Sequence, residues 1–458
     1  MRQDSYALTK AYGAFASGLC YGDLPAQALR IACTGFVDCL GVMLAGSTED
    51  AVTILHDTLD PSPGSAALVT GKGSASSMEA ALINATAAHA LDYDDVALGS
   101  HPSAVLVPAI LAEAQSLDLS GKDMLTAYLA GYEVWADLVA REPESLHTKG
   151  WHPTGIYGAV AAAAACASLH RLDAGRATHA IGIGASQGAG LMANFGSMTK
   201  PLHCGRAAQA GILAARLAGA GFTSAPDALE HAHGLLRVVS PSGRARLDGA
   251  DAIGQVWRIL SVGLSIKRYP TCYSTHRPID AMLDLVEAHA IAAPDVQGIE
   301  VSLSETFHQI LRNHRPESAL AAKFSVEFAL AGTVIAQRMS LKELTDDFVR
   351  RPDVQRLMTL VSIHTNTDYD AEFPGASRFD QVRVALKDGR VLESEPVARP
   401  LGHAQRPMSE VELFDKFSDC AAAAMAASDA QALLDRLRQL DQIRARELSL
   451  VNAFSSTL

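Results

Sequence analysis

The densest group of ionisable side chains lies between positions 89 and 103. It holds three carboxylates and two imidazoles within thirteen residues, namely His89, Asp92, Asp94, Asp95 and His101. If the apolar helix before them continued, Asp92 and Asp95 would share a face and Asp94 would point elsewhere. Such side chains can exchange protons, or bind a metal ion through oxygen and imidazole ligands. The structural alternative is a helix end followed by a polar loop.

A further imidazole, His152, stands directly before an apolar segment, Gly155–Leu169, that is predicted to be a helix. The positive end of a helix dipole lowers the pKa of an imidazole and favours bound anions. The position therefore suits an acid/base or anion-binding histidine. A capping turn with a structural histidine is the alternative.

The segment Lys200–Arg206 is basic and leads into another predicted helix. No Asp or Glu occurs from Ala174 to Pro226, so Lys200, His203 and Arg206 have no counter-charge nearby in the sequence. Carboxylates from elsewhere in the chain, or a bound anion, would have to pair with them. A solvated helix end is the alternative.

A second basic segment runs from Lys267 to Arg277, and no acidic residue occurs from Ala252 to Ile279. The segment lies where the chain changes from helical to mixed character. Domain junctions are preferred places for ligand pockets, although an ordinary hinge would look similar. Its potentially functional residues are Lys267, Arg268, Cys272, Tyr273 and His276. Considered by itself, Cys272 is better explained as a small buried residue than as a nucleophile.

Composition limits the class of protein. The 458 residues carry a formal charge of −12, and 48% are hydrophobic while 19% are charged. This balance excludes intrinsic disorder, and the acidic excess predicts no nucleic-acid partner. A small polyanion is still compatible, because the two acid-free stretches concentrate cations locally.

The sequence also predicts a cytoplasmic protein without a membrane partner. The first ten residues lack an apolar signal region. The longest apolar run, Gly155–Leu169, has about fifteen residues, whereas a membrane span needs roughly twenty. The seven cysteines are scattered and form no C-x-x-C, which is typical of a reduced compartment. No complete dinucleotide-binding glycine pattern and no H-E-x-x-H occurs, so neither a cofactor nor a metal is predicted.

Hydrophobic periodicity predicts a mainly α fold with a smaller α+β part. The predicted helices are Ala26–Ala45, Met78–Leu91, Lys122–Ala140, Gly155–Leu169, Arg206–Ala218, Pro278–Ile291, Ala321–Arg338 and a helical tail over Ser409–Phe454. The predicted strands are Gly298–Leu303, Leu357–Asn366, Gln381–Leu386 and Arg390–Glu395, the last two joined by an Asp388-Gly389 turn. We expect residues 1–268 and 400–458 to form an all-helical domain and residues 269–399 an inserted α+β lid.

Taken together, the motifs described above and several further segments of the chain resemble the MmgE/PrpD family. This family includes 2-methylcitrate dehydratase, cis-aconitate decarboxylase and iminodisuccinate epimerase. The resemblance spans most of the chain. It is carried, in order, by Asp38–Ser47, Asn84–Pro108, Gly131–Val134, Gly150–Gly158, Thr199–Phe222, Lys267–Ala281 and Ala322–Phe328.

The resemblance implies a homodimer with a cleft between a helical domain and a lid. It also implies chemistry on a small di- or tricarboxylate without an iron–sulfur cluster or a required metal. The implied catalytic residues are Asp92, His101, His152, Lys200, Lys267 and His276. Around them we expect His203, Arg206, Arg268, Cys272 and Tyr273 to bind substrate.

The first expectation for the activity is a hydro-lyase, followed by an epimerase and then a cis-aconitate decarboxylase. Two features depart from the family pattern: Phe328 replaces a frequent tyrosine, and the loop from Asp95 to His101 is shorter. More distant alternatives are a metal-dependent hydrolase, with His89, Asp92, Asp94, Asp95 and His101 as ligands, and a carboxylate-binding protein without activity.

Overall fold

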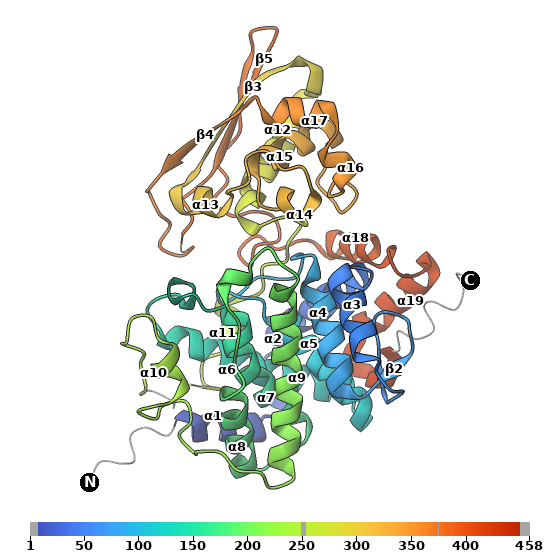
Figure 1. The fold of residues 1–458 in the computed structure, drawn as a ribbon, viewed down its shortest axis with the longest axis vertical. Coiled ribbons are helices and arrows are strands. Elements are labelled where there is room, and N and C mark those ends of the chain that lie inside the picture. The colour runs from blue at the N-terminus through green and yellow to red at the C-terminus, as the bar shows by residue number, and fades with distance from the viewer. Residues whose placement is uncertain (1–7, 249–252, 374, 449–458) are drawn as a thin grey trace. The chain divides into compact units, whose positions relative to one another are not determined.

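The computed structural model describes residues 8–248, 253–373 and 375–448. The chain divides into two compact units (Figure 1). Unit 1 comprises Met1–Ser265 and Ser409–Leu458, and unit 2 comprises Ile266–Met408. Most described residues of unit 1 are helical, and unit 2 adds a small mixed sheet, so the fold is mainly α as predicted.

Unit 1 is built from helices joined by short connections. Its helices are α1 (Leu8–Gly18), α2 (Ala26–Gly46), α3 (Asp50–Leu59), α4 (Ser77–Ala90), α5 (Pro102–Leu117), α6 (Gly121–Arg141), α7 (Pro153–Leu169), α8 (Ala174–Ala185), α9 (Thr199–Gly219), α10 (Leu235–Val239), α11 (Arg258–Val262), α18 (Glu410–Ala421) and α19 (Ala427–Arg438). Two short strands, β1 (Ala66–Ala67) and β2 (Ser74–Ala75), pair antiparallel.

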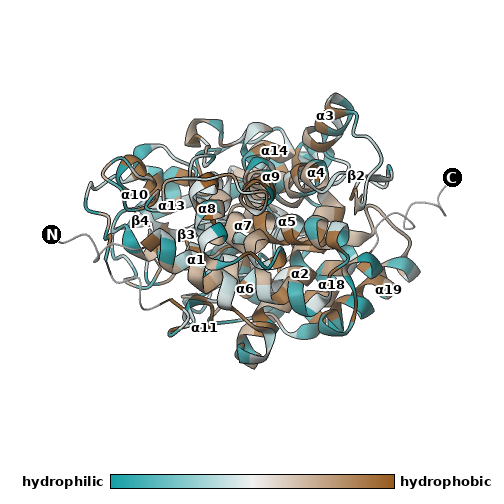
Figure 2. Ribbon diagram, turned by 90° about the horizontal axis from the view of Figure 1, so that it is seen from below, coloured by the Kyte–Doolittle hydropathy of each residue, from teal (hydrophilic) through white to brown (hydrophobic). Residues whose placement is uncertain are grey.

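Helix α7 is the central helix of unit 1. It packs against α5, α6, α8 and α9, which surround it in Figure 2. Nearly all of its residues are buried, because its alanine-rich sequence is apolar on every face. Helix α9 packs as closely against α4. This packing fixes the C-terminal end of α4 and the N-terminal ends of α5, α7 and α9. The residues of the candidate site lie at these helix ends.

The C-terminal helix α18 packs on α2, although the two are far apart in the sequence. Their backbones come close at Gly41, where an added Cβ would lie 3.1 Å from Cδ2 of Phe417. Among the described residues, α2 alone is long and apolar enough to cross a membrane, by length and composition. Since 72% of its most apolar window is buried inside the protein, it has the burial of a core helix.

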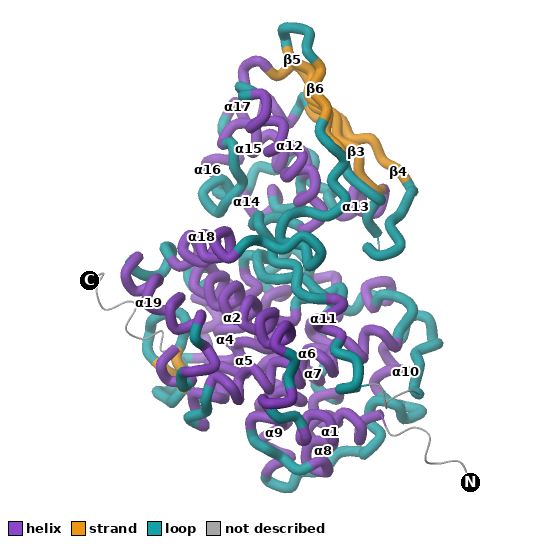
Figure 3. The backbone as a smooth tube through the Cα atoms, turned by 180° about the vertical axis from the view of Figure 1, so that it is seen from behind, coloured by secondary structure: helices purple, strands orange, loops and turns teal. Residues whose placement is uncertain are grey.

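Unit 2 consists of a four-stranded sheet with helices on one face (Figure 3). The strands are β3 (Val296–Ser304), β4 (Val361–Asn366), β5 (Gln381–Leu386) and β6 (Val391–Glu393), in the order β4-β3-β5-β6. Strands β3 and β4 are parallel, and the other pairs are antiparallel. The helices are α12 (His276–His289), α13 (Glu305–Ile310), α14 (Ala319–Ala322), α15 (Val326–Ala336), α16 (Asp346–Val349) and α17 (Pro352–Met358).

The predicted helices and strands are confirmed, with three corrections. The segment Lys200–Arg206 does not precede a helix but forms the first turns of α9, which begins at Thr199. The predicted strand Leu357–Asn366 starts as the end of α17, and only Val361–Asn366 is extended. The predicted helix Ala321–Arg338 is interrupted before α15 by a turn, where Ser325 caps the new helix. The end of the predicted C-terminal helical segment, beyond residue 448, lies outside the described residues.

Candidate functional site

The site in unit 1 begins where helix α4 ends. The helix stops at Ala90, and Asp92 adopts a left-handed conformation with φ 53°. Asp92 and Asp95 therefore do not share a helix face, so that prediction was wrong. The reversal of the chain at Asp92 instead sends the three carboxylates of the loop toward three different partners. Left-handed backbone is uncommon outside glycine, and asparagine and aspartate adopt it most readily.

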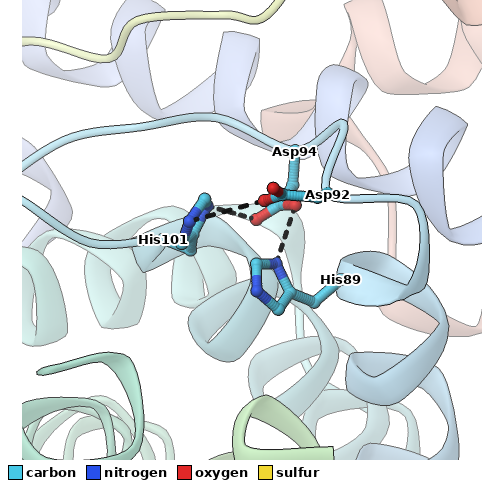
Figure 4. A group of neighbouring side chains, drawn as sticks. All are labelled: His89, Asp92, Asp94 and His101. Atoms are coloured by element: carbon cyan, nitrogen blue, oxygen red, sulfur yellow. Dashed lines mark hydrogen bonds and ion pairs between the residues drawn. The ribbon is translucent and has the colours of Figure 1, made fainter. Parts of the chain in front are cut away.

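Asp94 joins two imidazoles and is the centre of the group in Figure 4. Its Oδ1 lies 2.9 Å from Nδ1 of His89, and its Oδ2 lies 2.9 Å from Nδ1 of His101. Burial alone would raise the pKa of Asp94, but the two imidazoles hold that pKa well below its usual range. Burial and the nearby cations lower the pKa of His89 to about 4. Nδ1 of His89 donates to Asp94, and Nδ1 of His101 donates to the carbonyl oxygen of Asp95 at 3.1 Å. Because both acceptors can only accept, Nδ1 of each ring carries a hydrogen.

Asp92 connects Lys200 of helix α9 to the group formed by Asp94 and its two imidazoles. Its Oδ1 lies 3.1 Å from Nζ of Lys200 and 3.7 Å from Nε2 of His101. Burial opposes the charge of Lys200, yet the neighbouring carboxylates Asp92 and Asp94 raise its pKa above the ordinary value. The counter-charge that Lys200 lacks in its own segment therefore comes from a distant carboxylate. Nε2 of His101 is the imidazole nitrogen that remains for proton exchange beside a charged lysine.

The third carboxylate of the loop, Asp95, belongs to a separate buried chain of hydroxyl groups. Its Oδ2 accepts from Oγ of Ser103 at 2.7 Å, and the same hydroxyl lies 2.7 Å from the hydroxyl of Tyr128. Burial and the nearby Asp38 raise the pKa of Asp95 well above its usual range. Asp95 thus binds the first turn of helix α5 through Ser103. His101 occupies the N-cap position of the same helix.

A pair of imidazoles, His152 and His203, lies beside this group. His152 lies at the N-cap position of α7, as predicted for a residue before this helix, and its Nδ1 lies 3.0 Å from Nδ1 of His203. Exactly one of the two nitrogens can carry the hydrogen of this contact. Burial lowers both pKa values, with Lys200 adding to the effect, so both rings are neutral near pH 7.

One residue of this neighbourhood, Phe195, carried no signal in the sequence. Its ring meets the His152 ring edge to face at 5.0 Å, and Nζ of Lys200 lies 5.2 Å from its centroid. An aromatic ring in this position shields the lysine and the imidazole from water on one side. Arg206, by contrast, is exposed on α9, and its guanidinium donates to Gln209. The structure does not bring Arg206 into the group around Asp92.

Four side chains of the site have the types and spacing of a metal-ligand set. One ligand atom from each of His89, Asp92, Asp94 and His101 lies within 4.8 Å of the others. However, Asp92 already pairs with the Lys200 ammonium, and Asp94 lies 2.9 Å from Nδ1 of both imidazoles. A metal ion would have to compete with that ammonium for the same carboxylate. The arrangement is better suited to proton transfer beside a cation.

The residues predicted from the second basic segment lie in unit 2. Lys267 and His276 are buried there, whereas Arg268, Cys272 and Tyr273 are partly exposed. The His276 ring lies 5.0 Å from the Tyr273 ring, and its Nε2 lies 3.3 Å from the carbonyl oxygen of Thr271. The backbone N–H of Cys272 donates to the carbonyl of Lys323 at 2.9 Å. The segment thus has a fixed local structure within unit 2.

Phe328 belongs to the apolar core of unit 2. It lies in the first turn of α15, is fully buried, and meets Phe348 edge to face at 6.3 Å. Its side chain has a packing role at this position. The residue that departs from the family pattern therefore lies in the core of unit 2.

Comparison with known proteins agrees with the sequence resemblance. The family model described as MmgE/PrpD N-terminal domain matches residues 11–248, and that of the MmgE/PrpD C-terminal domain matches residues 269–442. A cis-aconitate decarboxylase of Aspergillus terreus is 26% identical over 94% of this chain and 92% of its own length. The cis-aconitate decarboxylases of Mus musculus and Homo sapiens are 25% and 26% identical, over 80% of this chain and 76% of their own lengths.

Proposed function

This chain belongs to the MmgE/PrpD family, and we propose that it is a lyase acting on a small di- or tricarboxylic acid by proton transfer at a carbon next to a carboxylate. The observation that carries the proposal is the position of Asp92 between two groups. Its carboxylate lies 3.1 Å from the Lys200 ammonium and 3.7 Å from Nε2 of His101. A cation and a proton-exchanging imidazole are thereby held side by side.

This pairing matches what the chemistry requires. Negative charge develops on a carbon beside a carboxylate, and delocalises onto the carboxylate oxygens. A fixed cation such as Lys200 stabilises that charge more in the transition state than in the ground state. His101 exchanges the proton through Nε2, while the carbonyl of Asp95 accepts from Nδ1 and, with the nearby Asp94 carboxylate, fixes the ring. The neutral His152 and His203 add hydrogen-bonding groups without adding charge.

Among the reactions of this class, decarboxylation of an unsaturated tricarboxylic acid has the most direct support, because the relatives above are named cis-aconitate decarboxylases. In that reaction the bond between a carboxylate carbon and its neighbour breaks, and carbon dioxide leaves. The electron pair stays on the remaining allylic system, and protonated His101 donates a proton to carbon. Lys200 stabilises the remaining carboxylate while the charge develops.

Dehydration is the second candidate, and was the first expectation from sequence. In that case neutral His101 removes the proton next to a carboxylate, and a hydroxyl group on the adjacent carbon leaves as water with a proton from a second acid. Dehydration would need this second acid in addition to His101, whereas decarboxylation needs only one proton-transferring group. Epimerisation would use the same proton abstraction without loss of a group.

A substrate screen distinguishes these reactions. Cis-aconitate, 2-methylcitrate, citrate and iminodisuccinate would be incubated with the protein in deuterium oxide and followed by proton NMR. Carbon dioxide loss with one deuterium at carbon indicates decarboxylation, a new double bond without carbon loss indicates dehydration, and exchange without a change in composition indicates epimerisation. No reaction with any acid of this class would contradict the proposal.

Two substitutions test the assigned residues. We expect Lys200→Ala and His101→Ala each to lower kcat/KM by roughly 100-fold or more, the value expected for one positioned group. The matched controls are Lys72→Ala and His231→Asn, which change exposed side chains of unit 1. Near-wild-type kcat/KM in either site variant would remove that residue from the mechanism.

A further inference from the structure

A lysine from the C-terminal part of the chain reaches the loop that carries Asp92. Lys416 lies in α18, and only 4% of its side chain is exposed. Its Nζ lies 2.5 Å from Oδ1 of Asp38 in α2 and donates to the carbonyl oxygen of Tyr93 at 2.9 Å. The same ammonium lies 4.0 Å from the centroid of the Tyr93 ring. One buried cation therefore joins α18, α2 and this loop.

The carbonyl that Lys416 holds lies at a decisive place in the loop. It belongs to the peptide between Tyr93 and Asp94, directly after Asp92 with its φ of 53°. Asp92 points to Lys200, and Asp94 points to His89 and His101. A displacement of this peptide would move Asp94 directly and Asp92 through the intervening Tyr93. A left-handed non-glycine residue persists only where its surroundings fix it.

We propose that Lys416 is a positioning residue for the reaction, which holds the Tyr93 carbonyl so that Asp92 and Asp94 reach Lys200 and the two imidazoles. This inference rests on the proposed function for its kinetic consequence and on the contacts above for its geometry. Asp38 orients the ammonium, and the Tyr93 ring covers it. Lys416 itself takes no part in proton transfer.

A purely structural role would give a different result when the charge is removed. In Lys416→Met the buried Asp38 carboxylate loses this cationic partner, and removing one member of a buried ion pair is strongly destabilising. In Lys416→Met combined with Asp38→Asn that charge is gone, but the donor to the Tyr93 carbonyl is still missing. The double variant therefore separates the stability of the ion pair from the position of the loop.

The experiment uses the full chain and three variants. They are Lys416→Met, the double variant Lys416→Met/Asp38→Asn, and Phe417→Leu as the matched control. Phe417 is the next residue of α18 and packs on α2, so its truncation weakens the same helix contact without touching the loop. Melting temperature, kcat, KM and hydrogen exchange of the peptide spanning residues 91–97 are measured for each.

We expect the double variant to recover most of the melting temperature lost in Lys416→Met. Its kcat should stay at least tenfold below wild type with KM changed less than threefold, and its loop should exchange at least tenfold faster. Phe417→Leu should lower the melting temperature while keeping kcat and the loop exchange near wild type. If the double variant does not fold, Lys416→Gln/Asp38→Asn takes its place with the same expected split, because it also removes both charges, refills the site with two amides, and has a side chain one bond shorter than lysine at position 416.

Wild-type kcat and wild-type loop exchange in a stable double variant would overturn the proposal. An equal loss of kcat in Phe417→Leu would overturn it as well. General loosening of α18 would then be sufficient to explain the loss of kcat in the double variant. The loop exchange does not depend on any substrate. A wild-type protein that turns over no acid, together with faster loop exchange in the double variant, would therefore contradict the proposed function and not the positioning role of Lys416.

Discussion

Nζ of Lys200 lies 3.1 Å from Oδ1 of Asp92, although the two residues are 108 positions apart in the chain. The contact joins the first turn of α9 to the loop after α4, and Asp92 can make it because its backbone turns left-handed. It gives the lysine of an acid-free segment its counter-charge. It also brings the cation next to His101, which is the basis of the mechanism proposed above.

The charge of Asp92 can be removed without changing its shape. We expect Asp92→Asn to lower kcat/KM by roughly 100-fold, because a neutral amide orients neither the Lys200 ammonium nor protonated His101 as strongly. The melting temperature should also fall, because the largely buried Lys200 loses one of its carboxylate partners, although asparagine adopts left-handed backbone as readily as aspartate. Steady-state kinetics and thermal unfolding check both parts.

The control for this substitution is Asp57→Asn, which removes an exposed carboxylate paired with Lys72. It should leave kcat/KM unchanged. A value within threefold of wild type for Asp92→Asn would show that the Asp92–Lys200 contact has no role in the reaction.

The contact between His203 and His152 predicts a graded effect. His203→Ala leaves Nδ1 of His152 without its imidazole partner, and we expect kcat to fall by roughly tenfold through loss of one fixed tautomer. His203→Asn keeps a side chain that can donate or accept, so it should retain more activity. Nitrogen-15 NMR of the His152 ring reports the tautomer directly. Wild-type kcat in both variants, with an unchanged ring spectrum, would disprove this coupling.

Close packing of α4 on α9 predicts a stability effect at one glycine. A Cβ added at Gly205 would lie 2.4 Å from the carbonyl oxygen of Leu82 and 2.4 Å from Oγ1 of Thr86. Gly205→Ala therefore pushes the helices apart and should lower the free energy of unfolding by about 1–3 kcal/mol. It should also lower kcat, because Lys200 moves with α9. Denaturant titration and kinetics measure the two effects.

The same helix provides the matched control. A Cβ at Gly219 would meet only Cδ2 of Leu172, at an ordinary 3.5 Å. Gly219→Ala should be neutral or slightly stabilising. Equal effects of the two substitutions would mean that the separation of α4 and α9 does not limit stability.

The buried His89 predicts a loss of stability in mildly acidic solution. Its pKa is lowered to about 4, whereas a histidine in an unfolded chain titrates near 6.5. Between these values the unfolded state binds a proton that the folded state does not, so the free energy of unfolding falls as the pH falls. One such group contributes a slope of about 1.4 kcal/mol per pH unit in that window.

Denaturant titrations of wild type and His89→Gln between pH 7 and pH 5 measure this slope. The variant should lose less stability than wild type over the same range, and His231→Gln, an exposed control, should behave as wild type. Identical slopes for wild type and His89→Gln would show that His89 is not buried in its neutral form.

Residue type and periodicity predicted the main helices and the groups around Asp92, His101, His152 and Lys200. They placed the end of helix α4 at Leu91, within one residue of the observed end at Ala90, but periodicity does not report the backbone conformation that follows, so the left-handed turn at Asp92 was not predicted. The role of Asp94 was missed for the same reason, because it was expected to point away. Its position between His89 and His101 depends on the turn.

Contacts between distant segments account for most of what the sequence did not reveal. Lys416 meets Asp38 and Tyr93 across 378 and 323 positions, and nothing in its own segment marks it as more than a helix residue. Phe195 lies among exposed residues, so its ring contacts follow only from the arrangement of α7 and α9. The burial of Phe328 in the core of unit 2 likewise could not be inferred from the residues around it in the sequence.

The central claim is that His101, between Asp94 and Asp92, exchanges a proton with the carbon next to a substrate carboxylate. The most direct measurement is the incorporation of solvent deuterium at that carbon, followed by proton NMR with the reacting acid, for wild type and His101→Asn. The account predicts incorporation by wild type and a rate at least roughly 100-fold lower for His101→Asn. Incorporation at the wild-type rate by His101→Asn would contradict it.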